Sequence, residues 1–139
     1  MTTHSLPRCV IGLGMALLLS SSCATAGGLR TESLDVGIVR EFGGDYAGVL
    51  RATRAAITGA GLAIDSHDQI NDTTAMIVAK KGMSAWSWGE LVRVVVQELS
   101  NDRVAVRVLS KRRMATNVTA KGDYSEAIFS SIEMAVAEP

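Results

Sequence analysis

A valine at every second position from residue 104 to residue 108 is the feature that most restricts the fold of this chain. Ala105 and Arg107 occupy the positions between them, and Arg103 precedes the first valine. Successive side chains of a strand point to opposite faces of a sheet, so this pattern predicts a strand over 103–109 with one buried face. A second valine-rich run, residues 90–99, precedes it. The two runs indicate a hairpin in an antiparallel sheet that another layer must cover.

The connection at Asn101 and Asp102 leaves the register of this hairpin open. A two-residue loop would place Gln97 on the face of the three valines of 104–108. A longer loop or a bulge would instead bring the valines of 92–96 onto that face. We favour the second arrangement, because a slip of one residue moves every side chain of a strand to the opposite face.

The remaining periodicities predict an α+β fold, an antiparallel sheet of about five strands with two helices packed on one face. The expected order is β-α-β-β-β-β-α. The strands are expected over 34–42, 62–66, 73–80, 90–99 and 103–109, the helices over 46–60 and from 124 onward, and loops over 67–72, 81–89 and 110–122. Asp45 and Asp123 can cap the two helices, and Glu126 can complete a capping box with Asp123. Gly61 supplies the stop of the first helix.

Residues 1–26 have the pattern of a signal peptide: a positive start at Arg8, an uncharged apolar stretch over 9–19, and small residues after it. The apolar stretch is shorter than the ~20 residues that cross a bilayer. Cleavage after Ala26 is one expectation. The alternative, which we prefer, is a bacterial lipobox ending at Cys23, which would become the lipidated first residue. Ser20 stands where a lipobox has a large aliphatic residue.

The mature chain is expected to comprise a tether over 27–33 and a single α+β domain over 34–139. Both cysteines, Cys9 and Cys23, lie in the leader, so this domain has no disulfide, no thiol nucleophile and no cysteine-ligated metal. Fourteen basic residues balance fourteen acidic ones. Nucleic-acid binding is therefore not expected, because it needs a basic excess. No cofactor is expected either.

Two groups of residues are candidates for contact with a partner. Trp86 and Trp88 stand one residue apart in the predicted loop 81–89, where they could bind a partner or fold back over the sheet. Lys111, Arg112 and Arg113 form a basic run that could meet anionic lipid headgroups or peptidoglycan-type polymers, or could remain a solvated loop.

His67, beside Asp65 and Asp68, is the strongest candidate for a metal site or a general base. The residues around it are also those expected of a polar turn, and they lack a diagnostic ligand spacing. The chain has no G-x-S-x-G element and no phosphate-binding glycine loop outside the leader. We therefore expect no enzymatic activity. The alternative is a soluble periplasmic ligand-binding protein or enzyme that uses the His67 turn.

Three segments carry a resemblance to known proteins: the helix over 46–53 with its stop at 61–62, the valine-rich hairpin ending in 104–108, and residues 122–125 opening the last helix. Together they resemble a small family of uncharacterised bacterial exported and lipid-anchored proteins of about this length. The layout is also similar to the helix-grip domains of the outer-membrane-assembly lipoprotein C.

The leader and the absence of a reactive group of residues lead us to expect a non-enzymatic binding or assembly-accessory domain, at the periplasmic face of the outer membrane or soluble in the periplasm. The expected partners are the membrane, through a lipid on Cys23, and an envelope protein. The family has no assigned activity, so it supplies no catalytic residue.

Overall fold

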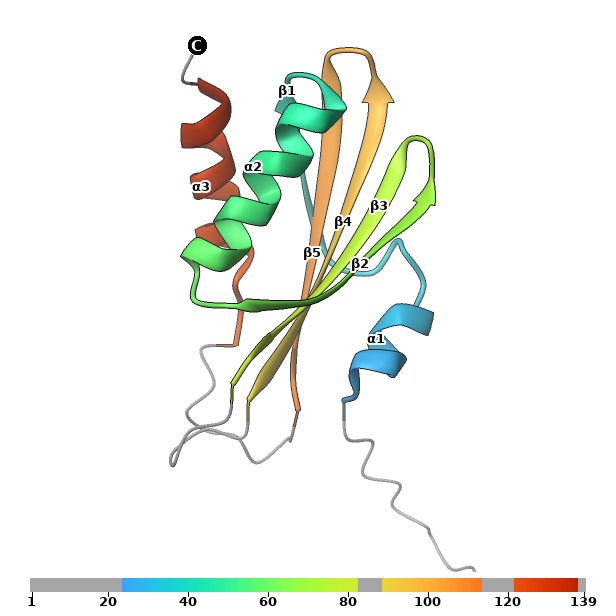
Figure 1. Cartoon of the computed structure of the whole chain (residues 1–139), viewed down its shortest axis with the longest axis vertical. Coiled ribbons are helices and arrows are strands. Elements are labelled where there is room, and N and C mark those ends of the chain that lie inside the picture. The colour runs from blue at the N-terminus through green and yellow to red at the C-terminus, as the bar shows by residue number, and fades with distance from the viewer. Residues whose placement is uncertain (1–23, 83–88, 114–121, 138–139) are drawn as a thin grey trace, which may run out of the picture.

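The computed structural model describes residues 24–82, 89–113 and 122–137, and it has the α+β fold that the sequence predicts (Figure 1). Five antiparallel strands form one sheet in the order β1-β5-β4-β3-β2. The elements in chain order are α1 (Ala26–Thr31), β1 (Ile38–Gly43), α2 (Tyr46–Gly59), β2 (Ala63–Asn71), β3 (Thr74–Lys81), β4 (Glu90–Ser100), β5 (Arg103–Arg112) and α3 (Ser125–Ala137). The β-α-β-β-β-β-α order is thus preceded by one further helix, α1.

Helices α2 and α3 lie side by side and cover one face of the sheet, as expected (Figure 1). The core between them and the strands is almost entirely aliphatic. Its buried members include Val49, Ile57, Ile77, Val92, Val94, Val96, Val104, Val106, Val108, Ile128, Phe129 and Ile132. This burial provides the main driving force for folding, at about 25 cal/mol per Å² of apolar surface removed from water.

The β4–β5 hairpin contains the bulge that its valines require. Ser100 lies opposite Arg103 across a tight turn, and the register then shifts between Glu98 and Ser100. Beyond the shift, Val96 lies opposite Val106, so the valines of both strands share the helix-covered face. Residues opposite one another in an antiparallel pair point to the same face. The preference for a bulge over a plain two-residue loop is therefore confirmed.

The helix boundaries follow local signals in the sequence. The carboxylate of Asp45 accepts a hydrogen bond of 2.7 Å from the Gly48 amide at the start of α2. Gly61, with φ of +77°, follows the end of that helix, in a conformation that favours glycine. At the start of α3, Asp123 accepts from the Ser125 amide. Glu126 does not complete the expected capping box, because its carboxylate binds Arg40 of β1.

Three predicted boundaries are wrong. Strand β1 begins at Ile38 rather than at residue 34. Strand β2 continues to Asn71, so His67 lies within a strand opposite Ile77 and not in a turn. This strand is at the edge of the sheet, where polar side chains face water and resemble the composition of a turn. Strand β5 continues to Arg112, so the basic run begins on a strand rather than in the loop predicted over 110–122.

The expected tether over 27–33 is also wrong. Residues 26–31 form α1, and the side chain of Leu29 is 1% exposed. This helix packs on β3 and β4, on the face of the sheet opposite α2 and α3 (Figure 1). The sheet is therefore covered on both faces along part of its length.

Helix α3 offers a matched test of the core. Ile128 is fully buried, whereas Met134 of the same helix is 66% exposed. We expect Ile128→Ala to lower the free energy of unfolding by about 2–5 kcal/mol, because it leaves a cavity. Met134→Ala should change it by less than about 0.5 kcal/mol. Urea denaturation followed by circular dichroism measures both, and equal losses would contradict this packing.

Candidate functional site

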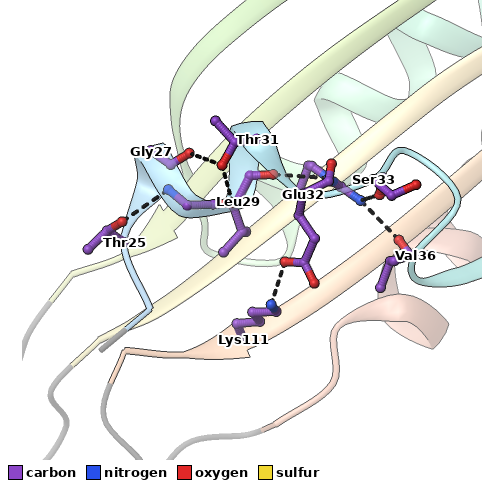
Figure 2. Close-up of polar contacts among 10 residues, drawn as sticks. Thr25, Gly27, Leu29, Thr31, Glu32, Ser33, Val36 and Lys111 are labelled. Carbon is purple, nitrogen blue, oxygen red and sulfur yellow. Dashed lines mark hydrogen bonds and ion pairs between the residues drawn. The ribbon is translucent and has the colours of Figure 1, made fainter. Parts of the chain in front are cut away.

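The chain before β1 is attached to the sheet by one buried arginine. Arg93 of β4 is 1% exposed and points to the face that α1 covers. Its Nη1 donates to the carbonyls of Leu29 (3.0 Å) and Glu32 (2.6 Å). Its Nη2 donates to the carbonyls of Ser33 (2.8 Å) and Val36 (3.1 Å). We call residues 25–36 the N-terminal strap; Figure 2 shows its polar contacts.

The environment of Arg93 is unusual for a charged group, because all four acceptors are main-chain carbonyls. Burial lowers the pKa of the Arg93 guanidinium. The negative charge of the nearby Glu32 raises this pKa, and the positive charge of Arg107 lowers it further. An arginine nevertheless stays protonated in proteins. Hydrogen bonds from a charged donor contribute about 1.5–3 kcal/mol each, so these contacts hold the strap firmly.

Side-chain contacts at both ends of α1 add to this attachment. Thr25 caps the helix: its hydroxyl accepts from the Gly28 amide at 3.0 Å (Figure 2). Arg30 donates to Ser66 and lies 3.7 Å from the Asp68 carboxylate, both on β2. A further contact is the ion pair between Glu32 and Lys111 of β5 (Figure 2).

Basic residues gather at the end of the sheet from which the described chain starts. Lys81, Glu90 and Arg112 lie opposite one another on three neighbouring strands, and Arg113 follows directly. Ala24, the first described residue, lines the same shallow groove as Arg112. We call this region the anchor end, defined by residues 24–25, 80–82, 89–90 and 111–113.

A buried carboxylate lies beneath this basic group. Glu90 is 3% exposed and accepts hydrogen bonds from the Tyr124 hydroxyl and from the Gly122 amide. Burial raises the pKa of the Tyr124 hydroxyl, and the bond and charge of Glu90 raise it further. The Nζ of Lys81 lies 5.9 Å from the centre of the Tyr124 ring. Glu90 thereby joins the start of α3 to β4.

The predicted site residues have different outcomes. Lys111, Arg112 and Arg113 all lie at the anchor end, where Lys111 is committed to Glu32. Cys23, Trp86 and Trp88 fall outside the described residues.

His67 is exposed on β2, and its two neighbouring carboxylates are occupied by cations, Asp65 by Lys80 and Asp68 by Arg30. Across residues 24–82, 89–113 and 122–137, no group of three potential metal ligands comes together.

Arg93 and Glu90 were not recognised as buried from the sequence. A signal for Arg93 was present, because it interrupts the otherwise apolar run 91–96. Such a run is typical of a central strand covered on both faces, where a charge must find partners. Glu90 and Lys81 carry no comparable signal, since their positions depend on the pairing of three strands.

None of the helices in the described part of the chain is long and apolar enough to cross a membrane. Comparison of the sequence with protein-family models and with curated proteins finds no match.

Substitution of Arg93 should release the strap. We expect Arg93→Met to lower the free energy of unfolding by about 2 kcal/mol or more, because it leaves one buried and three partly buried carbonyls without their donor. Amide exchange at Leu29 should accelerate, since its amide bonds only the Thr25 carbonyl at the start of α1. Arg107→Met is the matched control, because Arg107 donates to a single strap carbonyl, that of Asp35. Unchanged exchange at Leu29 in the Arg93 variant would contradict this role.

The raised pKa of Tyr124 predicts a loss of stability at high pH. Above pH ~10 a tyrosine ionises in the unfolded chain while Tyr124 keeps its proton in the folded one. The unfolded state then binds fewer protons, so the free energy of unfolding falls by up to about 1.4 kcal/mol per pH unit. Tyr124→Phe should flatten this slope, whereas Tyr46→Phe should retain it. Urea denaturation between about pH 9 and 11 measures how the free energy of unfolding changes with pH in each variant. Equal slopes for the two variants would contradict the role assigned to Tyr124.

Proposed function

We propose that this protein is an exported bacterial envelope protein, lipidated at Cys23, that serves as a non-enzymatic binding or assembly-accessory domain. The observation that carries the proposal is the start of α1. Thr25 caps this helix and Ala26 is its first residue. Cleavage after Ala26 would remove both, whereas processing at Cys23 would retain the whole helix. The structure of the strap therefore favours the lipobox over the alternative cleavage site.

A lipid on Cys23 would be joined closely to the folded domain. Only Ala24 separates Cys23 from the helix cap, and consecutive Cα atoms are about 3.8 Å apart. The cap, the Arg93 contacts and the Glu32–Lys111 pair then tie the anchor to β4 and β5. Such an anchor would present the domain to the membrane in one orientation, with the anchor end nearest the bilayer. A flexible tether would not do so.

An accessory role agrees with the resemblance to lipid-anchored envelope proteins. The expected contact residues Trp86 and Trp88 belong to the segment that joins Lys81 to Glu90, and both of these flanking residues lie at the anchor end. The alternative, a ligand site at His67, has less support. The carboxylates beside this histidine already neutralise Lys80 and Arg30.

The intact mass of the mature chain tests the lipid anchor. We expect membrane fractions to contain a chain that begins at Cys23 and carries a diacylglyceryl group. Cys23→Ser should abolish that modification and with it the chain that begins at residue 23. Cys9→Ser, which changes the other leader cysteine, should leave it unaffected. A soluble, unmodified chain beginning at Gly27 would overturn the proposal.

A further inference from the structure

Charge is segregated along the sheet, although the chain as a whole is neutral. The anchor end carries the exposed Lys81, Arg112 and Arg113. The opposite end, where the turns after β2 and β4 lie, carries the exposed Asp72 and Asp102. Asp45 is at this acidic end too, because the neighbouring Gly44 donates to the Asp102 carbonyl. The domain therefore has a basic pole and an acidic pole.

Three cations of the basic pole are not neutralised by carboxylates of the described residues. Nearby carboxylates have other partners: Glu32 binds Lys111, Asp65 binds Lys80, Glu90 is buried under Tyr124, and the exposed Asp123 accepts from the amide and hydroxyl of Ser125. Within the described ranges, no carboxylate forms an ion pair with the three remaining cations, Lys81, Arg112 and Arg113.

We propose that these three residues dock the domain onto anionic phospholipid headgroups, an inference that extends the lipid-anchor proposal. Arg112 lines the same groove as Ala24, the residue next to Cys23. An acyl chain on Cys23 would hold this groove against the bilayer, well within the Debye length of about 8–10 Å over which exposed charges interact. Basic residues beside a membrane attachment point strengthen binding to anionic lipid, each by about fivefold. A second signal of this kind complements an acyl anchor.

Vesicle flotation tests this inference separately from lipidation. The full chain with Cys23→Ser is mixed with phosphatidylcholine vesicles, or with vesicles in which phosphatidylglycerol replaces a third of the lipid. The leader, which contains Arg8, is the same in every variant, so the change in the ratio of the two binding constants between variants isolates the contribution of the three residues. We expect an anionic preference of about 100-fold from three residues at low salt. It should be lost at about 0.5 M salt.

Matched charge variants locate the contact. Lys81→Gln, Arg112→Gln and Arg113→Gln combined should reduce the preference to a few-fold. The matched control combines Arg51→Gln, Arg54→Gln and Arg103→Gln, which remove the same charge from exposed residues of α2 and of the acidic end. This control variant should retain the preference for anionic vesicles. Thermal unfolding of both variants verifies that they fold. Soluble glycerol phosphate in excess should not compete, because a single free phosphate lacks the array of charges on a bilayer.

The results separate the two proposals. A wild-type chain without anionic preference, an equal loss in both triple variants, or full competition by glycerol phosphate would overturn the docking surface. If the wild type shows no preference but binds an envelope protein through these residues, the surface is a protein interface instead. Lipidated Cys23 without headgroup preference would leave the anchor proposal standing alone. Headgroup preference in a chain that begins at Gly27 would support docking and refute the anchor.

Discussion

The buried guanidinium of Arg93 is the interaction on which the arrangement of the N-terminal part depends. A charge taken out of water must be compensated, and here the compensation comes from four carbonyls of one short stretch of backbone. The strap cannot leave the sheet without exposing Leu29, the buried apolar side chain that it places against β3 and β4. Its departure would also leave the Arg93 guanidinium without its four hydrogen-bond acceptors. One side chain thereby determines which face of the sheet the chain crosses before β1, and where residue 24 lies.

This attachment gives the domain a defined direction. The strap fixes the start of the described chain at one end of the sheet, and strand pairing brings Lys81, Glu90 and Arg112 to that same end. The acidic turns lie at the other end. A protein anchored through a long tether would gain nothing from such polarity, because it could present any surface. In the proposed lipid-anchored protein, the strap would hold the anchor rigidly, and the charge distribution would then face the membrane in one direction.

The sequence is sufficient to predict the α+β class, the valines of β4 and β5 that face the helices, and the bulge between these two strands. Each of these features depends on local or neighbouring residues. Alternating valines define a face, Asp45 and Gly61 delimit α2, and the register follows from keeping Gln97 out of the core.

Helix α1 was not predictable in this way. Its sequence contains Gly27 and Gly28, which disfavour a helix, and the arginine that holds it lies 64 residues away from Leu29. The length of β2 was missed because polar residues on an edge strand resemble a turn. Within the candidate site, the run 111–113 was recognisable from its charge, whereas Lys81 joins it only through strand pairing.

An apolar residue could not simply take the place of Arg93. Replacing both members of a buried ion pair by packed hydrophobic residues is often neutral or stabilising, because both charges disappear together. At Arg93 the partners are main-chain carbonyls, which no substitution removes. Those of Leu29 and Glu32 belong to the C-terminal end of α1, where helical carbonyls lack intrahelical donors. The guanidinium therefore completes the end of α1 from a neighbouring strand. A six-residue helix with two glycines can persist here because β4 supplies the donors and the positive charge that its C-terminus requires.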